Sequence, residues 1–337
     1  FPGLGIFTSP TYLNTVNRTA LTGAPRGLTT GQIDDTLAFL NSLTGTVPRR
    51  GDQILLLPKL DWNINSKNTF TINYNRLRWD SPAGIQTQAT NTRGRASFGD
   101  DFVDIDWVTG RLVSTISPRI VNEFRFQVAR DLEYEFSQKP LPGEPTTGLN
   151  GSAPDVFLTN GLEFGKPTFL ERPQYPDEKR YQFTDNVTVS NGVNTLKFGV
   201  DINRVKDVLA NLRNESGAYS YNNINDFIID YVNWKTPLAA TVTCVNSTRT
   251  RGKCYTSNYA QGFGVQGAEL KTTDYNFFAQ YDWKFLPHVT FNLGVRYEYQ
   301  KLADAQIPNA ATDTIPNTGR TIAEATSFIP SDKNNFG

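Results

Sequence analysis

The sequence has no methionine, one histidine (His288) and only two cysteines among its 337 residues. So few nitrogen and sulfur ligands cannot complete a four-coordinate zinc site. Asp100, Asp101, Asp104 and Asp106 are dense enough for a calcium site but lack EF-hand spacing, so charges on a wet face are the favoured interpretation and we expect no metal site. Lysine plus arginine and aspartate plus glutamate each number 33, so the formal net charge is zero. A chain without excess positive charge offers no broad basic surface, and we expect no nucleic-acid partner.

The sequence also lacks the usual catalytic patterns. His288 follows Pro287 in a predicted tight turn, and neither a GxSxG motif nor a paired-carboxylate cleft accompanies it. Gly262–Gly267 has GxGxxG spacing, but polar, strand-like sequence surrounds it where a dinucleotide site needs a strand before and a helix after. We therefore expect no enzyme, no catalytic residue and no cofactor.

Long apolar runs are missing as well. No segment approaches the roughly 18 apolar residues of a membrane-spanning helix, and the mean hydropathy is −0.43. Strands that cross a membrane would not produce such a run, because half of each strand is polar and the loops are polar too. Hydropathy alone therefore does not separate a soluble chain from a barrel.

What the sequence does contain is long alternation of apolar and polar residues. In Val289–Gln300 one set of alternate positions is wholly apolar and the other wholly polar, apart from a glycine, as in a strand with one oily and one wet side. The same alternation, weaker in the first and fifth cases, recurs in Ile54–Trp62, Phe70–Asn75, Val103–Trp107, Ile120–Phe136, Tyr181–Val189, Leu196–Asn203 and Tyr275–Phe285. That makes about eight strands, several longer than the usual five or six residues.

The connections between these strands alternate in length. Short turns are predicted at Asn63–Asn68, Ser117–Arg119, Ser190–Asn194 and Leu286–His288, and long connections at Asp80–Asp100, Ser137–Lys179 and Arg204–Thr272. Short turns on one side and long loops on the other are typical of outer-membrane barrels. We predict an all-β, antiparallel up-and-down transmembrane β-barrel, present in part as about eight strands of a larger barrel, with long loops that carry short helices.

This prediction divides the chain into three regions. Residues 1–50 form an outward loop segment with a short helix at Gly31–Leu43, and residues 51–302 carry the hairpins and long extracellular loops, with a second short helix at Asn225–Trp234. Residues 303–337 form an extracellular loop that leads into a missing next strand. We expect both helices to pack onto the barrel rim.

The alternation assigns side chains to two environments. The residues expected to face lipid are Phe124, Phe126, Val128, Leu196, Phe198, Val200, Phe277, Tyr281, Phe291, Leu293 and Val295. Those expected to face the lumen are Glu123, Arg125, Lys197, Asp201, Gln280, Asp282, Asn292, Arg296 and Glu298. Those expected in aromatic girdles at the membrane interfaces are Trp62, Trp79, Trp107, Trp283, Tyr297 and Tyr299. Asp104 and Asp106 are also expected in the lumen.

Cys244 and Cys254 lie ten residues apart in the longest loop. Two thiols in a polar loop predict a disulfide and an oxidising compartment, and two unpaired thiols are the alternative. Basic residues gather in two of the predicted loops: Arg93, Arg95, Arg249, Arg251 and Lys253. They suit contact with lipopolysaccharide phosphates, and solvated surface charge is the alternative.

Several motifs resemble the barrel of TonB-dependent outer-membrane receptors, in the Oar-like branch whose members begin with a carboxypeptidase-regulatory-like domain. TLKFGVDINRV (Thr195–Val205), DYNFFAQYDWKF (Asp274–Phe285) and VTFNLGVRYEY (Val289–Tyr299) resemble consecutive strands of that family. TISPRIVNEFRF (Thr115–Phe126) resembles a family hairpin, and PSDKNNFG (Pro330–Gly337) the approach to a further strand.

The resemblance implies a 22-stranded barrel in a Gram-negative-type outer membrane, surrounded by lipid and lipopolysaccharide. It also implies energy-coupled uptake of a large or scarce ligand, whose binding residues are unknown. The plug and the contact with the TonB complex are expected in N-terminal parts outside this chain. Two other classes stay open: a structural or adhesive barrel that displays loops, and a soluble β-sandwich binding module.

Overall fold

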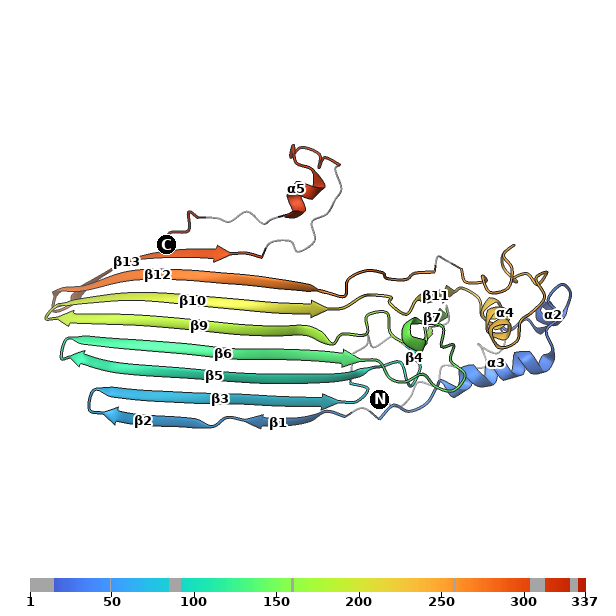
Figure 1. The fold of residues 1–337 in the computed structure, drawn as a ribbon, viewed down its shortest axis with the longest axis horizontal. Coiled ribbons are helices and arrows are strands. Elements are labelled where there is room, and N and C mark those ends of the chain that lie inside the picture. Colours follow the sequence, from blue (N-terminus) through green and yellow to red (C-terminus); the bar gives the residue numbers. More distant parts are fainter. Residues whose placement is uncertain are drawn as a thin grey trace.

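Long antiparallel strands lie side by side in one sheet, and a smaller folded body stands at one end of them (Figure 1). The structure, a computed structural model, describes residues 15–48, 50–84, 92–158, 161–256, 259–303, 313–327 and 333–337. The strands of the large sheet are β1 (Asp52–Leu56), β2 (Lys59–Asn65), β3 (Asn68–Ser81), β5 (Asp100–Ser117), β6 (Ile120–Phe136), β9 (Gln174–Asn191), β10 (Asn194–Ala210), β12 (Ala268–Leu286) and β13 (Val289–Lys301).

The sheet has nine strands in the order β1-β3-β5-β6-β9-β10-β12-β13, with β2 also paired to β3. All neighbours are antiparallel, and the first and last strands do not meet. This confirms the predicted all-β, up-and-down part of a barrel. Tight turns join the strands at one end, and long connections leave from the other (Figure 1).

The predicted strand Ile54–Trp62 is two strands that share the neighbour β3. Pro58 lies between them and has no N–H to donate to a ladder. Its carbonyl still accepts a hydrogen bond from the Tyr74 N–H at 3.0 Å, so both pieces keep to the same neighbour. The break raises the strand number from about eight to nine.

The connections at the open end fold into a separate body, the loop domain. It contains a four-stranded sheet in the order β11-β7-β8-β4, and several helices. Its elements are α2 (Arg18–Thr22), α3 (Thr30–Ser42), β4 (Thr92–Arg93), η2 (Leu149–Gly151), β7 (Asp155–Leu158), β8 (Leu162–Phe164), β11 (Ala218–Tyr221) and α4 (Ile224–Lys235). A further helix, α5 (Ile322–Ser327), lies in the C-terminal region. In the described residues, no helix combines the length and apolar character that crossing a membrane requires.

Helices α3 and α4 occupy the two predicted helical segments. A capping box starts α3: the Gln32 N–H donates to Thr29 Oγ1 at 3.2 Å, and the Thr29 N–H donates to Gln32 Oε1 at 2.9 Å. The helices pack on each other and on the small sheet. The stacked rings of Phe39 and Tyr231 are 4.5 Å apart, and Phe164 of β8 meets Phe39 edge-on at 5.8 Å. We expected packing onto the barrel rim, and instead the loops build a core of their own.

The buried apolar core of the described chain lies in this loop domain. Its cluster includes Leu21, Leu28, Ile33, Leu40, Val156, Leu158, Leu162, Phe164, Phe227, Ile228, Ile229 and Val242. These residues come from segments up to about two hundred positions apart in the sequence, so no single stretch of sequence predicts this core. The large sheet contributes nothing to this cluster.

The C-terminal residues pair with the free edge of β13. The Arg296 N–H donates to the Gly337 carbonyl at 2.8 Å, and the Glu298 N–H donates to the Asn335 carbonyl at 3.1 Å. The end of the PSDKNNFG motif thus approaches a strand position beside β13, as predicted. Its first residues, Pro330–Asp332, lie outside the described residues.

Candidate functional site: a two-faced wall and a loop domain

Strand register sorts the side chains of the large sheet onto two faces. Directly paired residues of an antiparallel sheet point to the same side. Phe124, Asp185, Val200, Phe277 and Tyr297 form one such row across five strands. All residues predicted to face lipid lie on this side, which we call the apolar face. All those predicted to face the lumen lie on the other, the polar face.

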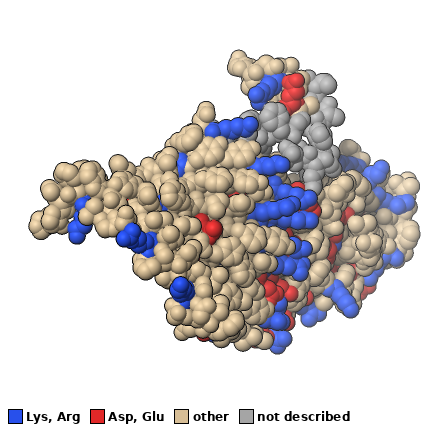
Figure 2. Space-filling view, turned by 60° about the vertical axis from the view of Figure 1, so that its left-hand side comes forward, with Lys and Arg blue, Asp and Glu red and all other residues tan. Residues whose placement is uncertain are grey.

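The apolar face is uncovered. Leu293, Val295 and Phe198 are 61%, 53% and 47% exposed. Figure 2 shows a broad, mostly uncharged stretch followed by a column of Lys and Arg toward the loop domain. Since no second layer covers these side chains in the part of the chain that the structure describes, the β-sandwich alternative is wrong. Contact of this face with lipid stays a prediction.

Two of the six predicted girdle residues lie on the other face. Trp62, Trp283, Tyr297 and Tyr299 belong to the apolar face. Trp107 pairs with Asn75 and Ala129, and Trp79 pairs with Gln53 and Val103, which places both tryptophans on the polar face. These two therefore cannot share an outward girdle with the other four.

Asp104 and Asp106, which were expected to face the lumen, are also on the side opposite to the predicted one. They lie on the side of the apolar face, where Asp106 pairs with Arg76 and Arg130. Alternation separates residues into two sets but does not say which set faces which way. Near the loop domain the side of the apolar face also carries charged residues, so the phase of Val103–Trp107 predicted the wrong side.

The polar face is held together by side-chain bonds between strands. Asp201 accepts hydrogen bonds from Gln182 Nε2 at 2.8 Å, Thr184 Oγ1 at 2.6 Å and Asn276 Nδ2 at 3.2 Å. Glu123 forms ion pairs with Arg111 and Arg125. Such mutual pairing fixes these charges and polar groups on the surface of the sheet.

One aromatic residue of the polar face was missed by the sequence analysis. Phe278 pairs with Gly199, and its ring covers the space that a side chain at Gly199 would fill. The apolar face has a polar pair that was also missed: Asn122 Nδ2 donates to Asp185 Oδ1 at 2.6 Å. In both cases a residue that breaks the alternation fits a residue on a neighbouring strand. The register of the sheet is needed to see which residues meet.

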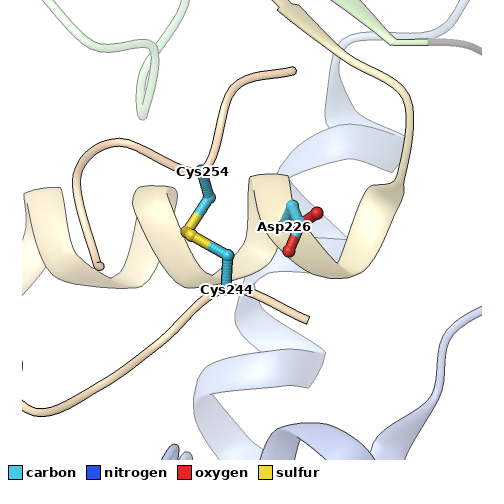
Figure 3. A group of neighbouring side chains, drawn as sticks. All are labelled: Asp226, Cys244 and Cys254. Carbon is cyan, nitrogen blue, oxygen red and sulfur yellow. A yellow bond between two sulfur atoms is a disulfide. The ribbon is translucent and has the colours of Figure 1, made fainter. Parts of the chain in front are cut away.

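The disulfide between Cys244 and Cys254 is present, as predicted, and both residues are buried in the loop domain (Figure 3). Asp226 of α4 lies beside it. Because the two sulfur atoms are bonded to each other, they are not thiolates that could bind a metal together with Asp226.

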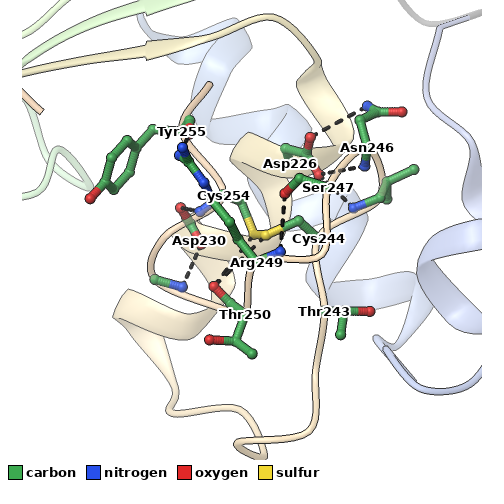
Figure 4. Close-up of a disulfide and its surroundings, with 12 residues drawn as sticks. Asp226, Asp230, Thr243, Cys244, Asn246, Ser247, Arg249, Thr250, Cys254 and Tyr255 are labelled. Atoms are coloured by element: carbon green, nitrogen blue, oxygen red, sulfur yellow. Dashed lines mark hydrogen bonds between the residues drawn. A yellow bond between two sulfur atoms is a disulfide. The ribbon is translucent and has the colours of Figure 1, made fainter. Parts of the chain in front are cut away.

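Two carboxylates of α4 hold the disulfide loop (Figure 4). Asp230 accepts hydrogen bonds from the N–H groups of Gly252 at 2.5 Å and Cys254 at 2.7 Å, and from the Tyr221 hydroxyl at 3.1 Å. Asp226 accepts one from the Val245 N–H at 2.6 Å. Burial raises the pKa of Asp230 to about 6, although the two N–H groups favour its charged form.

Three of the five basic loop residues, Arg93, Arg249 and Arg251, bond to other residues of the loop domain, whereas Arg95 and Lys253 are exposed. Arg93 pairs with Glu163 at 2.9 Å and its side chain is only 6% exposed. Arg251 donates to Asn233 Oδ1 at 2.9 Å, and Arg249 donates to the Tyr255 carbonyl at 2.6 Å. Contact of Arg93 with lipopolysaccharide, as considered from the sequence, is therefore wrong.

A groove of about 590 Å³ opens on the loop domain between α3 and α4. Phe39 and Tyr231 line it together with polar residues of both helices, among them Gln32, Asp35 and Lys235. It combines aromatic surface with charges of both signs, which suits an amphipathic ligand.

The sequence matches the family described as outer membrane beta barrel domain over residues 4–337. No curated protein matches the chain. Among solved structures, the outer membrane transporter YddB from Escherichia coli is 10% identical with a TM-score of 0.45, over 75% of this chain and 28% of that one. The copper transporter OprC is 11% identical with a TM-score of 0.40, over 86% of this chain and 34% of that one.

The ferric-catecholate import receptor Fiu from Escherichia coli, in its open form, is 11% identical with a TM-score of 0.40, over 86% of this chain and 43% of that one. The chain thus spans less than half the length of each of these structures. Its own match to the family covers nearly all of its residues. This chain belongs to the family of outer membrane beta barrel domains and is a protein of the Gram-negative outer membrane.

Proposed function

We propose that this chain forms part of the barrel wall of a TonB-dependent receptor that imports a large or scarce ligand. The observation that carries the proposal is the division of one continuous sheet into an uncovered apolar face and a hydrogen-bonded polar face. In an outer-membrane barrel such a sheet turns its apolar side to lipid and its polar side to the lumen. Membership of the outer-membrane family supports this arrangement.

The loop domain supports a role in ligand capture. It stands where the long connections leave the sheet, at the end that is extracellular in barrels of this kind. Its own buried core and disulfide hold the groove between α3 and α4 in a fixed shape. A ligand would first meet this groove and then pass along the polar face. We assign no catalytic step to either part.

The Oar-like assignment and the coupling to TonB rest on the resemblance of the strand motifs. Coupling can be tested with the full-length protein purified from outer membranes and a periplasmic fragment of TonB. We expect saturable binding of the fragment, measured by surface plasmon resonance, and no binding to a porin used as the matched barrel control. Equal responses for the two barrels would contradict the proposal.

A second function is favoured by the loop domain itself: a barrel that displays this domain at the cell surface, for structure or adhesion. A rigid, disulfide-held body outside the membrane suits contact with another surface as well as it suits ligand capture. Cells that bear the protein would then attach to a surface in a manner that depends on the loop domain, while the purified protein would not bind the TonB fragment.

A further inference from the structure

A row with five basic residues and one aspartate crosses the sheet at the loop end of the apolar face. Successive register partners on β3, β5, β6, β9, β10 and β12 are Arg76, Asp106, Arg130, Lys179, Lys206 and Lys271. With strands about 4.8 Å apart, the row is about 24 Å wide. Figure 2 shows this gathering of Lys and Arg as a column beside the mostly uncharged stretch.

Neighbouring rows on the same side enlarge the set, which we call the basic belt. Its members are Arg76, Arg78, Arg130, Lys179, Arg204, Lys206, Lys271 and Lys301. The acidic residues on the same side of these rows are Asp104, Asp106, Asp177 and Glu269. Eight cations against four anions leave the belt with excess positive charge, although the whole chain is neutral.

The excess is concentrated where three lysines stand on three adjacent strands. Lys179 pairs with Lys206, and Lys206 pairs with Lys271. Glu269 lies 2.7 Å from the Lys206 amine and 2.5 Å from the Lys271 amine, so one carboxylate serves two cations. Asp177 lies 2.7 Å from Arg130 and 3.9 Å from Lys179. Like charges directly opposite each other destabilise a sheet unless a further anion lies between them.

The belt lies one membrane thickness from the turn end of the sheet. From Leu196 to Lys206 the strand advances about 33 Å, or about 25 Å along the membrane normal for a strand tilt of about 40°. That height equals the apolar band of an outer-membrane barrel. Tyr181 lies in the lowest row of the belt, beside Arg204, and Tyr275 and Tyr299 lie in the row immediately below it, as rings at an interface do. The belt therefore stands at the headgroups of the outer leaflet.

We propose that the basic belt binds the phosphates of a phosphorylated glycolipid of the outer leaflet, such as lipid A. Acyl chains of that lipid would lie on the apolar face directly beside the belt, while its phosphates complete the neutralisation that the acidic residues leave unfinished. Arginine and lysine are the side chains that bind phosphate by charge-assisted hydrogen bonds. The inference rests on lipid contact by the apolar face and does not depend on TonB coupling.

Two lysine pairs on the same strands allow a matched test. Lys206→Gln/Lys271→Gln removes two belt cations, and Lys197→Gln/Lys284→Gln removes two from the polar face of β10 and β12. The full-length protein in non-ionic detergent would be titrated with lipid A that has both phosphates, one phosphate or none. Each lysine near an anionic lipid surface contributes a factor of about five to six in affinity, so the belt variant, which lacks two, should bind the bisphosphorylated lipid roughly 30-fold more weakly than wild type. The control variant should bind it as wild type does.

Three results would overturn the proposal: equal affinity of wild type for all three lipids, equal loss in the two variants, or displacement of lipid A by equimolar inorganic phosphate. The last would identify a simple anion site. Heat-modifiable mobility in gels shows whether each variant is folded. If the belt variant does not fold, the comparison of the three lipids on wild type still decides, because only a phosphate site distinguishes them.

Discussion

The ring of Phe278 on β12 lies so close to Gly199 on β10 that a Cβ atom at Gly199 would stand 2.0 Å from a ring carbon. Asn186 closes the same space from β9, with its Oδ1 atom at 2.3 Å from that position. The two neighbours leave no room for a side chain, so this glycine is required by contact and not by its backbone conformation.

Gly199→Val should therefore destabilise the wall. Overpacking of a fitted site costs typically about 1–3 kcal/mol, and here the phenyl ring must leave its place. Gly294→Val is the matched control on the same face, because the nearest atom to a Cβ there is the Ala279 carbonyl oxygen at 3.5 Å. Urea titration of the protein folded into vesicles measures both changes. A Gly199→Val midpoint equal to that of the control would contradict the packing argument.

Val295→Arg and Asn292→Arg place the same side chain on opposite faces of β13. Val295 is on the apolar face, where an arginine near the bilayer midplane costs about 2–4 kcal/mol. Asn292 is on the polar face, so its substitution should change the unfolding free energy by much less. The fraction of each variant that is heat-modifiable in isolated outer membranes gives the comparison. Similar fractions would count against lipid contact by the apolar face.

Sequence periodicity predicted some elements well because one phase of alternation holds over most of their length. β6 runs from Ile120 to Phe136, the predicted bounds, and the predicted helix at Gly31–Leu43 differs from α3 by one residue at each end. In contrast, only Val103–Trp107 was predicted within β5, because Gly110 and the charges near it interrupt the pattern. Periodicity thus finds the middle of a strand more readily than its ends.

Two features could be determined only from the structure: the face of the sheet on which a residue lies, and the core of the loop domain. Trp107 obeys alternation perfectly, and its side depends on its partners Asn75 and Ala129 in other strands. β7 and β8 have four and three residues, too few to show a period. The sequence predicted the disulfide because both cysteines lie close together in one loop, whereas no pattern in the sequence links them to Asp226 and Asp230, although these carboxylates lie in the same long connection.

The stability of the loop domain should fall as the pH rises through about 6. The pKa of Asp230 is about 6 in the folded state against 3.8 for an unperturbed carboxyl group, so between these values the folded state binds the extra proton. That contribution is fully present below pH 3.8, decreases through the interval and is lost above about 6, with a limit of about 3 kcal/mol. Thermal unfolding of the loop domain, followed by near-ultraviolet circular dichroism, measures it. Asp230→Asn should remove this pH dependence, and an unchanged pH profile in the variant would assign it to another group.

Lys166 joins two carboxylates in the loop region, and the three groups should behave as one unit. Its amine lies 2.9 Å from Glu171 and also pairs with Glu215, and its side chain is almost fully buried. Lys166→Met leaves both carboxylates without their cation, a change that typically costs about 3–5 kcal/mol. Adding Glu171→Gln and Glu215→Gln to Lys166→Met removes the stranded charges, so the triple variant should recover much of the loss. Urea unfolding of the single, double and triple variants gives the coupling free energy. If the carboxylates are left unpaired and repel each other, the two Glu→Gln substitutions should raise the unfolding free energy of the Lys166→Met variant. If the losses of the three substitutions simply add, the lysine contributes by packing alone.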